Sequence, residues 1–431
     1  MAGEWKRLAL ADAIDLISGG TPKTNVPDYW DGDIPWLSVA DFNTGYRWVS
    51  TAEKSITERG LTESATAVLN QGDIIISARG TVGVVAQLAK PMAFNQSCYG
   101  VRGRQGIAET NFLYYALRHA VSGMKQVAHG GVFDTITRDT FKIIEVDVPV
   151  LPEQRAIAHI LSTLDDKIEL NRRMSETLEA MARALFKTWF VDFDPVRARA
   201  EGRDPGLPAH LADLFPDSFE DSELGEIPRG WEVAPLPDAI EVNPNRPLRK
   251  GDVAPYLDMA NMPTRGHTPD EVVDRPFGSG MRFKDGDTLV ARITPCLENG
   301  KTAYVDFLGD EQVGWGSTEY IVLRPKPPLP LEFAYCLARS NEFREFAIQS
   351  MTGSSGRQRV PAEALSQYLI AAPGRQIAEH FGRIVAPIFA RASAAARESR
   401  TLSTARDTLL PKLISGELRV KDAERFTAGV T

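Results

Sequence analysis

The chain has 431 residues, of which 43% are apolar and 25% are charged, as expected of a globular protein with more than one hydrophobic core. Its formal net charge is −8, its three cysteines are scattered, and no stretch reaches the ~20 apolar residues that a membrane span requires. The composition thus excludes a membrane-spanning protein, a disulfide framework and a cysteine-based metal site, and without an apolar signal core at the N-terminus we expect a cytoplasmic protein.

The distribution of charge along the chain leaves DNA binding possible in spite of the negative net charge. A net charge of −8 ordinarily argues against binding to a polyanion such as DNA. Residues 201–230 alone hold eight acidic and two basic residues, whereas residues 373–431 hold ten basic and six acidic residues. The rest of the chain is near balance, so basic side chains gathered on one face are able to meet phosphates.

Residues 1–150 carry β-type signals. Short β-branched runs at 74–76 and 82–85 are punctuated by Gly and Pro, and one helical stretch at 111–124 interrupts them. This pattern predicts a compact α+β domain.

Residues 151–200 are assigned to a long central helix. Between 153 and 189 the apolar positions step alternately by four and by three, which is typical of a coiled-coil seam. Asn171 and Ser175 interrupt the seam, and a buried Asn commonly fixes the register of a coiled coil. Such a helix would be on the order of 55 Å long. The seam positions are Ile157, Leu161, Leu164, Ile168, Leu178, Ala182, Leu185 and Trp189.

The next two segments are an acidic connector and a second domain. Residues 201–230 combine Pro and Gly with acidic residues and are expected to form a surface linker. Residues 231–372 repeat the layout of the first domain, with strands expected at 288–290 and 320–323 and a helix at 331–348.

A second long helix is expected over residues 373–420, followed by a tail at 421–431 that is expected to be frayed from Arg425 onward. Pro387 should kink this helix or break it locally. Two such helices at equivalent points of the chain favour a mutual coiled coil over packing against the neighbouring domain alone. The seam positions of the second helix are Ile377, Phe381, Ile384, Ile388, Leu402 and Leu409.

The two halves of the chain match each other in order. The Trp-x4-Leu-x-Asp-Ala-Ile string at 5–14 returns at 231–240, and the Gly-Asp pair at 72–73 returns at 286–287. Because the order is kept while the spacing between matches changes, one unit has been duplicated and has diverged most in its loops. We predict an α+β fold with two similar domains of mixed sheets and short helices, separated by two long antiparallel coiled-coil helices in a pseudo-twofold internal repeat.

The sequence contains no recognisable catalytic constellation. Gly-Lys-Thr at 300–302 resembles the end of a phosphate-binding loop, but Pro295 stands where its first glycine belongs. The Asn/Asp-Pro-Pro-aromatic tetrapeptide of an amino-methyltransferase is missing. The Asp-Gly-Asp strings at 31–33 and 285–287 favour local hydrogen bonds in turns over metal binding. We therefore expect a non-catalytic chain that binds no metal and no cofactor.

Three strings resemble conserved segments of the specificity (S) subunits of type I restriction–modification systems. Gly-Gly-Thr-Pro-Lys-Thr at 19–24 and Tyr-Trp-Asp-Gly-Asp-Ile-Pro-Trp at 29–36 are similar to the start of a target-recognition domain. Leu-Phe-Lys-Thr-Trp-Phe-Val-Asp-Phe-Asp-Pro-Val at 185–196 resembles the central conserved region, and Leu-Leu-Pro-Lys-Leu-Ile-Ser-Gly-Glu-Leu at 409–418 resembles the distal one.

The resemblance implies a division of labour within a complex. Each target-recognition domain would read one half of a split target in double-stranded DNA, and the helices would set the gap. Two methyltransferase (M) subunits would carry S-adenosylmethionine, and restriction (R) subunits would add chemistry that uses ATP and Mg. The second copy has Asn-Pro-Asn-Arg-Pro at 243–247 where the first has its Gly-Gly-Thr-Pro string, so the target is expected to be asymmetric.

Candidate DNA contacts are polar residues on glycine-containing turns. Arg pairs with guanine, and Asn or Gln pairs with adenine, when a turn holds them against base edges. The favoured loop is 352–359, where glycines allow close approach of the backbone to phosphate; Arg292 is interpreted as the counterpart of Arg79. A solvated turn, or an ion pair for Arg79 and Arg292, is the alternative. The candidates are Lys23, Thr24, Arg79, Thr81 and His129 in the first copy, and Arg292, Lys301, Ser354, Arg357, Gln358 and Arg359 in the second.

Candidate contacts to partner subunits lie in the two conserved strings. Trp189 and Phe190 are adjacent and cannot share one helical face, so one of them is a candidate for contact with an M subunit. Packing against the second long helix is the alternative. Leu410 and Leu413 are the corresponding candidates in the distal string.

Two other classes of function remain open at this point. The first is an autonomous DNA methyltransferase or nuclease, which methyl transfer by the chain alone would reveal. The second is a tandem binding module for a ligand that is not a nucleic acid, which a salt-sensitive mobility shift on DNA would exclude.

Overall fold

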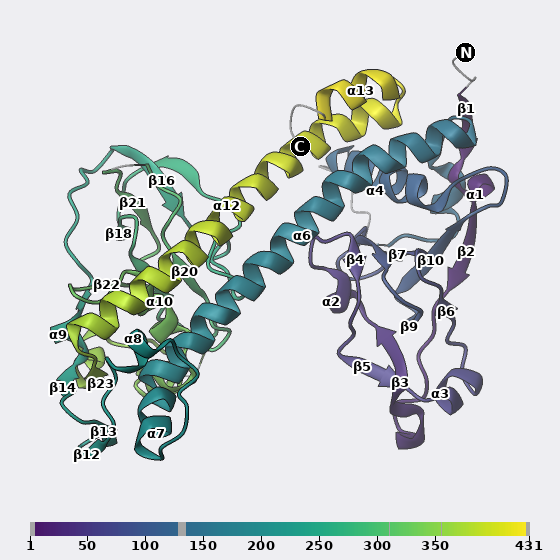
Figure 1. Ribbon diagram of the computed structural model, residues 1–431. Helices are drawn as coiled ribbons and strands as arrows, with labels where there is room; N and C mark the ends of the chain where they lie inside the picture. The colour runs from purple at the N-terminus through teal and green to yellow at the C-terminus, as the bar shows by residue number, and fades with distance from the viewer. Residues whose placement is uncertain (1–4, 128–134, 310, 355, 428–431) are drawn as a thin grey trace. The chain divides into compact units, whose positions relative to one another are not determined.

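The computed structural model describes residues 5–127, 135–309, 311–354 and 356–427. The chain divides into two compact units, Met1–Leu170 with Ser399–Thr431, and Asn171–Glu398. Each unit contains one copy of the repeat and a part of both long helices, α6 (Leu151–Phe190) and α12 (Arg375–Ile414) (Figure 1).

The first copy is built on two sheets and a two-stranded ribbon. The larger sheet has the order β2-β10-β7-β8-β4, and the smaller one has the order β5-β3-β9-β6, with β3 and β9 parallel. Helix α4 (Thr110–Val127) packs against β8 and β10. The strands are β1 (Lys6–Ala9), β2 (Ile14–Ser18), β3 (Trp30–Leu37), β4 (Trp48–Val49), β5 (Lys54–Ile56), β6 (Val68–Leu69), β7 (Ile74–Ser77), β8 (Val85–Leu88), β9 (Met92–Phe94), β10 (Cys98–Gly103) and β11 (Glu145–Val148), which pairs with β1. The short helices are α1 (Leu10–Ala13), η1 (Pro27–Tyr29), α2 (Val39–Phe42), α3 (Glu58–Thr62) and α5 (Thr140–Ile143).

The second copy repeats this arrangement strand for strand in its main parts. Its sheets have the orders β15-β22-β19-β20 and β17-β16-β21-β18, and β16 is parallel to β21 as β3 is to β9. The strands are β14 (Glu232–Pro235), β15 (Ile240–Val242), β16 (Val253–Leu257), β17 (Val273–Pro276), β18 (Met281–Phe283), β19 (Thr288–Ala291), β20 (Thr302–Tyr304), β21 (Gly314–Gly316), β22 (Tyr320–Pro325) and β23 (Leu369–Ala372), which pairs with β14. The helices are α9 (Leu236–Ala239), α10 (Glu332–Ala338), α11 (Asn341–Gln349) and η2 (Ala362–Gln367). The predicted α+β fold with a duplicated domain and two long helices is confirmed.

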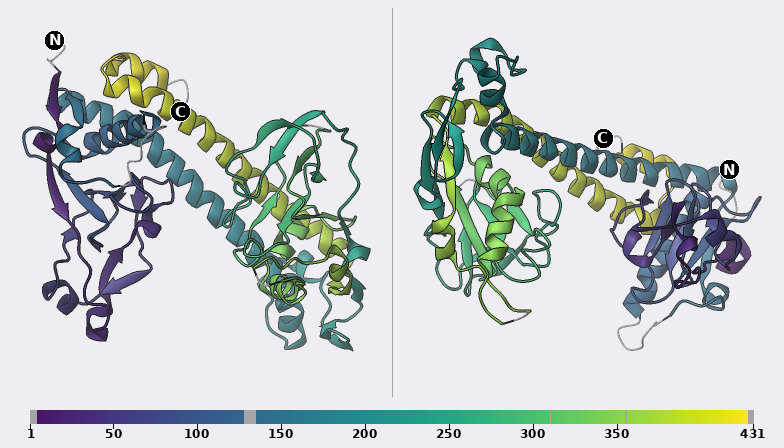
Figure 2. Two further views of the ribbon diagram at one scale, coloured as in Figure 1. Left: turned by 180° about the vertical axis from the view of Figure 1, so that it is seen from behind. Right: turned by 90° about the horizontal axis from the view of Figure 1, so that it is seen from below.

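The two long helices run side by side and antiparallel within each unit, as the views in Figure 2 show. In the first unit, Arg406 of α12 donates to Asp165 of α6 (Nη1 to Oδ1, 2.6 Å). In the second unit, the buried Asn171 donates its amide to Glu398 (Nδ2 to Oε2, 2.8 Å). The seam of α6 therefore carries a buried Asn with a partner on α12, as the periodicity predicted.

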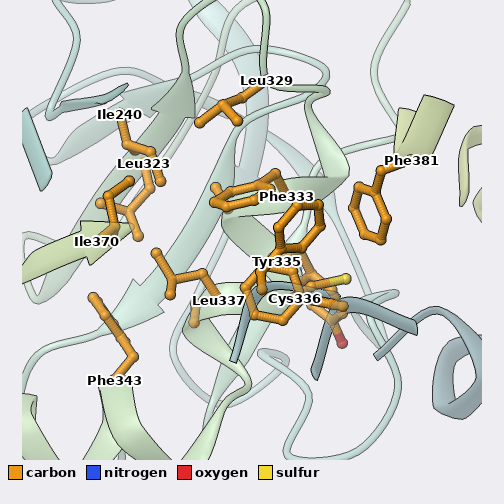
Figure 3. Packing of buried hydrophobic residues seen from close by; sticks show 14 of the residues in the cluster. Ile240, Leu323, Leu329, Phe333, Tyr335, Cys336, Leu337, Phe343, Ile370 and Phe381 are labelled. Carbon is orange, nitrogen blue, oxygen red and sulfur yellow. The ribbon is translucent and has the colours of Figure 1, made fainter. Parts of the chain in front are cut away.

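Each domain shares one hydrophobic core with both helices. In the first unit a buried cluster joins Phe112 of α4, Leu161 of α6 and Leu409 of α12. In the second unit the rings of Phe333 and Phe381 pack together, and these two residues come from α10 and α12 (Figure 3). The two cores thus bind domain and helices into one folded body in each unit.

Two local predictions are wrong, and a third is wrong in part. Helix α12 is not broken at Pro387, because this residue is exposed and the carbonyl that loses its N–H partner can be hydrated. The inward face of α12 runs through the buried Val385 and Phe389, whereas Ile384 is exposed. The single helix expected at 331–348 is split, since the Ser340 side chain accepts the N–H of residue 343 and starts α11 there.

One strand prediction also fails in part. Of the β-branched run at 82–85, only Val85 lies in a strand. Gly83 has a φ of 76°, which turns the chain between β7 and β8. The runs at 74–76, 288–290 and 320–323 form strands as predicted.

The acidic connector and the tail both have regular structure. The connector contains β12 (Phe219–Ser222) and β13 (Gly225–Pro228), and it is preceded by α7 (Asp194–Ala200) and includes α8 (Ala209–Ala212). Its side chains Leu211, Phe215 and Ile227 are buried against the second core. Most of its other residues are exposed, so the segment lies at the surface but is anchored to the second core. The described part of the tail forms α13 (Val420–Thr427), in which Ala423 is fully buried.

A buried ion pair occurs at the same place in both copies. Asp73 binds Arg102 (Oδ1 to Nε, 2.8 Å), and Asp287 binds Arg324 (Oδ1 to Nη1, 2.6 Å). Each aspartate also accepts the backbone N–H three residues before it at 2.8 Å, which confirms the turn role expected of the Asp-Gly-Asp string at 285–287. In the second copy Arg246 is a further partner of Asp287 (Nη2 to Oδ1, 3.0 Å).

Replacing Asp287 with Asn should lower the free energy of unfolding. The substitution leaves the guanidinium groups of Arg246 and Arg324 beside a neutral amide at a fully buried position. We expect a loss of about 2–4 kcal/mol, below the full cost of a buried unpaired charge because Arg324 is partly exposed. Urea unfolding followed by circular dichroism measures the effect, with Asp274→Asn on exposed β17 as the control. Equal midpoints for the two variants would contradict this account.

Candidate nucleic-acid interface

Backbone hydrogen bonds show which residues of the two copies correspond at the ends of β7 and β19. The carbonyl of Ala78 accepts the N–H of Ile136 at 2.9 Å, and the carbonyl of Arg292 accepts the N–H of Val360 at 2.9 Å. The strand registers agree with this alignment. Ala78 and Arg292 are therefore equivalent, and the interpretation that paired Arg79 with Arg292 is wrong by one residue. The shift of 214 residues that relates Asp73 to Asp287 also relates Ala78 to Arg292, so pairing the two arginines by residue type displaced the alignment by one position.

The second copy brings several candidate residues together on one hairpin. Thr352 and Arg359 exchange two backbone hydrogen bonds of 2.9 Å, and the carbonyl of Gln358 accepts the N–H of Thr294 at 3.0 Å. The loop 352–359 thus closes as a hairpin and lies against the segment that follows β19. Arg292, Gln358 and Arg359 are neighbours here, although their spacing in the sequence is more than 60 residues.

The tip of this hairpin is open to solvent. Ser354 and Arg357 are exposed, and the Arg357 N–H donates to the carbonyl of Ser354 at 3.0 Å. Among the described residues, no ion pair or hydrogen bond involves the guanidinium of Arg357. A free, exposed guanidinium on a defined turn has the chemistry to contact a phosphate or the edge of a guanine.

Arg359 differs from Arg357 because its guanidinium already forms an ion pair with a carboxylate of the protein. Its Nε donates to both carboxylate oxygens of Glu319 at 2.9 Å. This hydrogen bond raises the pKa of the Arg359 guanidinium above its ordinary value. Glu319 was not singled out from the sequence as a site residue. Its place directly before the strand at 320–323 was a signal that could have identified it. The buried Nε of Arg292 has no hydrogen-bond acceptor among the described residues.

Lys301 is engaged within the protein. Its ammonium donates to the carbonyl oxygens of Met259 and of Ala260, the latter at 3.2 Å. It also follows a turn and precedes β20, rather than opening a helix as a phosphate-binding loop would. This position favours a structural role for Lys301 over contact with DNA.

The first copy presents its candidates on two separate turns. Lys23 and Thr24 are exposed in the turn that leads to β3. Trp36 donates its indole N–H to the carbonyl of Gly20 (3.0 Å), and Trp30 donates to the carbonyl of Lys23 (3.2 Å). The Gly-Gly-Thr-Pro string and the Tyr-Trp and Pro-Trp strings therefore form one unit, in which the tryptophans hold the turn in place.

The glycine at position 20 is required by a close approach of backbone. A Cβ atom added there would lie 2.6 Å from the carbonyl carbon and oxygen of Ala65. No side chain fits without moving the backbone, which gives a steric reason for this glycine in the string.

The second turn of the first copy joins β7 to β8. Arg79 and Thr81 are exposed in it, and the hydroxyl of Ser77 donates to the carbonyl of Thr81 at 2.5 Å. Arg79 forms no ion pair with any of the described residues, unlike Arg359 of the second copy. His129 and its flanking glycines lie outside the described residues.

The candidate partner-contact residues are buried. Trp189 and Phe190 are 1% and 8% exposed, so the expectation that one of them faces solvent is wrong. Trp189 packs against Phe215 of the connector, and Phe190 packs against Trp231 at the start of the second copy. The end of α6 is enclosed on two sides, which a helical period alone does not show. Leu410 and Leu413, in α12, are likewise buried in the first core.

In the parts of the chain that the structure describes, no three His, Cys, Asp or Glu side chains gather closely enough to hold a metal ion. None of the helices in those parts has the length and hydrophobicity needed to cross a membrane.

Comparisons with known proteins agree with this architecture. The sequence model of the family described as "Type I restriction modification DNA specificity domain" matches residues 2–180. The "Type I restriction enzyme MjaIX specificity subunit" of Methanocaldococcus jannaschii is 27% identical over 97% of this chain and 94% of its own length. The "Type I restriction enzyme HindI specificity subunit" of Haemophilus influenzae is 26% identical over 72% of this chain and 78% of its own length.

A solved structure has the same fold. The type I restriction–modification S subunit from M. genitalium superposes with a TM-score of 0.53, over 96% of each chain and at 16% sequence identity. Both relatives are named specificity subunits, not methyltransferases or nucleases. With a duplicated α+β domain on two long helices, this chain is similar over nearly its whole length to type I restriction–modification specificity subunits, and its residues 2–180 match the model of their DNA specificity domain.

Proposed function

We propose that the chain reads a bipartite, asymmetric DNA target, one half-site by residues 1–150 and the other by residues 231–372. The observation that carries this proposal is the pair of equivalent strand ends after β7 and β19. The same scaffold presents an exposed Arg79 on a short turn in one copy and an Arg-rich hairpin in the other. Two equivalent scaffolds that present different side chains to DNA are suited to recognise two different half-sites.

The two long helices have a scaffolding role in this proposal. Helices α6 and α12, within the segments 151–200 and 373–420, hold the recognition domains and set the gap between half-sites. Because each core takes residues from both helices, a domain keeps a fixed place on its own part of the pair.

The catalytic work belongs to partner subunits in this proposal. Two M subunits bind S-adenosylmethionine and methylate adenine, and R subunits use ATP and Mg for restriction. The complex acts on DNA in the cytoplasm. The M-subunit contacts have to lie on exposed faces, because Trp189, Phe190, Leu410 and Leu413 are enclosed in the chain's own cores.

A negatively charged chain can bind DNA if local cations meet the backbone. Eight of the acidic residues lie in the connector 201–230, away in sequence from the reading turns. Lys23, Arg79 and Arg357 are exposed, and within the described residues none of their charged groups is paired. A mobility shift on DNA that weakens as salt rises would separate this proposal from a module for another ligand.

Exchanging residues 231–372 for the corresponding domain of a relative should change one half of the methylated motif. The first half should stay, because residues 1–150 keep their own core in the other unit. Methylation sequencing of DNA modified by the assembled complex measures the motif. A change in both halves would contradict the assignment of one domain to one half-site.

Replacing Arg357 with Gln should weaken DNA binding by the complex without affecting folding, since this side chain has no described partner. If it contacts a phosphate, the slope of log Kd against log salt should fall by about one. Titration of labelled target DNA at several salt concentrations measures the slope. Arg229→Gln removes the same charge from an exposed position in the acidic connector and serves as the control. Identical binding by the two variants would exclude Arg357 as a DNA contact.

A further inference from the structure

We propose that Glu319 is a positioning residue for DNA readout, which acts through Arg359 to hold the backbone of Arg357 in place. This inference rests on the proposed function of residues 231–372 as the reader of one half-site. Glu319 itself would not touch DNA. It would set the geometry of the side chain that does.

The link between Glu319 and Arg359 is a two-point contact. Arg359 Nε lies 2.9 Å from each carboxylate oxygen, and its Nη2 lies 2.8 Å from Oε1. A planar guanidinium held at two points has a fixed orientation, which a single hydrogen bond does not give. The side chains are 44% and 23% exposed, so solvent screens the pair and its main effect is on geometry rather than on stability.

The carboxylate end of this link is anchored to the core. The Glu319 carbonyl accepts the N–H of Arg292 at 3.0 Å, and its own N–H donates to the hydroxyl of Ser317 at 3.1 Å. The next residue, Tyr320, is fully buried at the start of β22. The position of the carboxylate is therefore set by the sheet rather than by the loop.

The guanidinium end reaches the backbone of the candidate DNA contact. Arg359 Nη1 donates to the carbonyl of Arg357 at 3.4 Å. The N–H of Arg357 donates to the carbonyl of Ser354 at 3.0 Å. Both backbone polar groups of Arg357 are thus bound, one of them by the side chain that Glu319 holds. A chain of contacts runs from the core through Glu319 and Arg359 to Arg357.

The two residues of the first copy that correspond to Glu319 and Arg359 cannot form such a link. Ala78 donates its N–H to the carbonyl of Ser97 at 2.8 Å, as Arg292 does to Glu319, so Ser97 occupies the position of Glu319. Thr135 precedes Ile136 as Arg359 precedes Val360. A serine and a threonine cannot form an ion pair, so the device is specific to the second copy. Its loss should affect one half-site alone.

The test uses the assembled complex of this chain with its M subunits. Glu319→Gln keeps the size of the side chain and removes its charge, and Arg359→Lys keeps the charge and removes the planar two-point contact. Glu345→Gln on the exposed face of α11 is the matched control. Methylation rates are measured on the target DNA and on DNA with single-base changes in each half-site, together with the thermal unfolding midpoint.

We expect Glu319→Gln and Arg359→Lys each to lower the ratio of target to altered-site methylation by about fivefold, the lower end of what one base pair usually contributes. The fall should occur only for the half-site read by residues 231–372. The swapped variant E319R/R359E should recover part of the ratio. The control variant should keep it, with unfolding midpoints close to that of the unsubstituted chain.

Three results would overturn the proposal. An unchanged ratio of target to altered-site methylation in Arg359→Lys would overturn it by itself, even if the Glu319→Gln variant does not assemble into the complex. A lower unfolding midpoint with an unchanged ratio would indicate a purely structural pair. An equal loss at both half-sites would indicate general loosening. The proposed function fails separately, if exchange of residues 231–372 leaves the methylated motif as it was.

Discussion

Neither recognition domain completes its hydrophobic core without residues from both long helices. In the second unit, Phe333 of the domain contacts Phe186 of α6 (ring centroids 5.0 Å apart) and Phe381 of α12 (6.4 Å). In the first unit, Leu161 and Leu409 supply the corresponding faces of α6 and α12. Burial of aromatic and aliphatic side chains is the largest favourable contribution to folding. Each domain and the parts of the helices beside it therefore fold together. Within each unit, the position of the reading surface is fixed by the packing of the domain on the helices.

This shared core allows the loops to vary without loss of the scaffold. The ion pair of Asp73 with Arg102 recurs as Asp287 with Arg324, which keeps the central strands of both copies in the same register. What differs is the chemistry at the strand ends, where Ser97 in one copy is replaced by Glu319 in the other. A duplicated protein can in this way read two different sequences with one architecture.

Much of the fold could be predicted from the sequence because it depends on local periodicity. The four-three step of apolar residues gave the bounds of α6 to within two residues, and the shifted matches predicted the second domain. Pro387 and Ile384 were misjudged because helix phase and solvent exposure depend on the surroundings of α12. The burial of both Trp189 and Phe190 depends on the connector, which folds back over the end of α6.

The candidate site was predictable in position but not in chemistry. The glycine-containing loop at 352–359 could be identified as an exposed turn near a strand end. That Arg359 is held by Glu319, and Lys301 by backbone carbonyls, depends on contacts between residues 40 or more positions apart. Side-chain identity predicts which groups are able to bind DNA, whereas tertiary contacts decide which of them remain free to do so.

The central claim is that one scaffold, used twice, reads two different half-sites. Methylation sequencing of DNA modified by the complex of the unsubstituted chain tests it most directly. The account predicts a split motif with two dissimilar specified halves and unspecified bases between them. A continuous motif, or one with two identical halves, would contradict it.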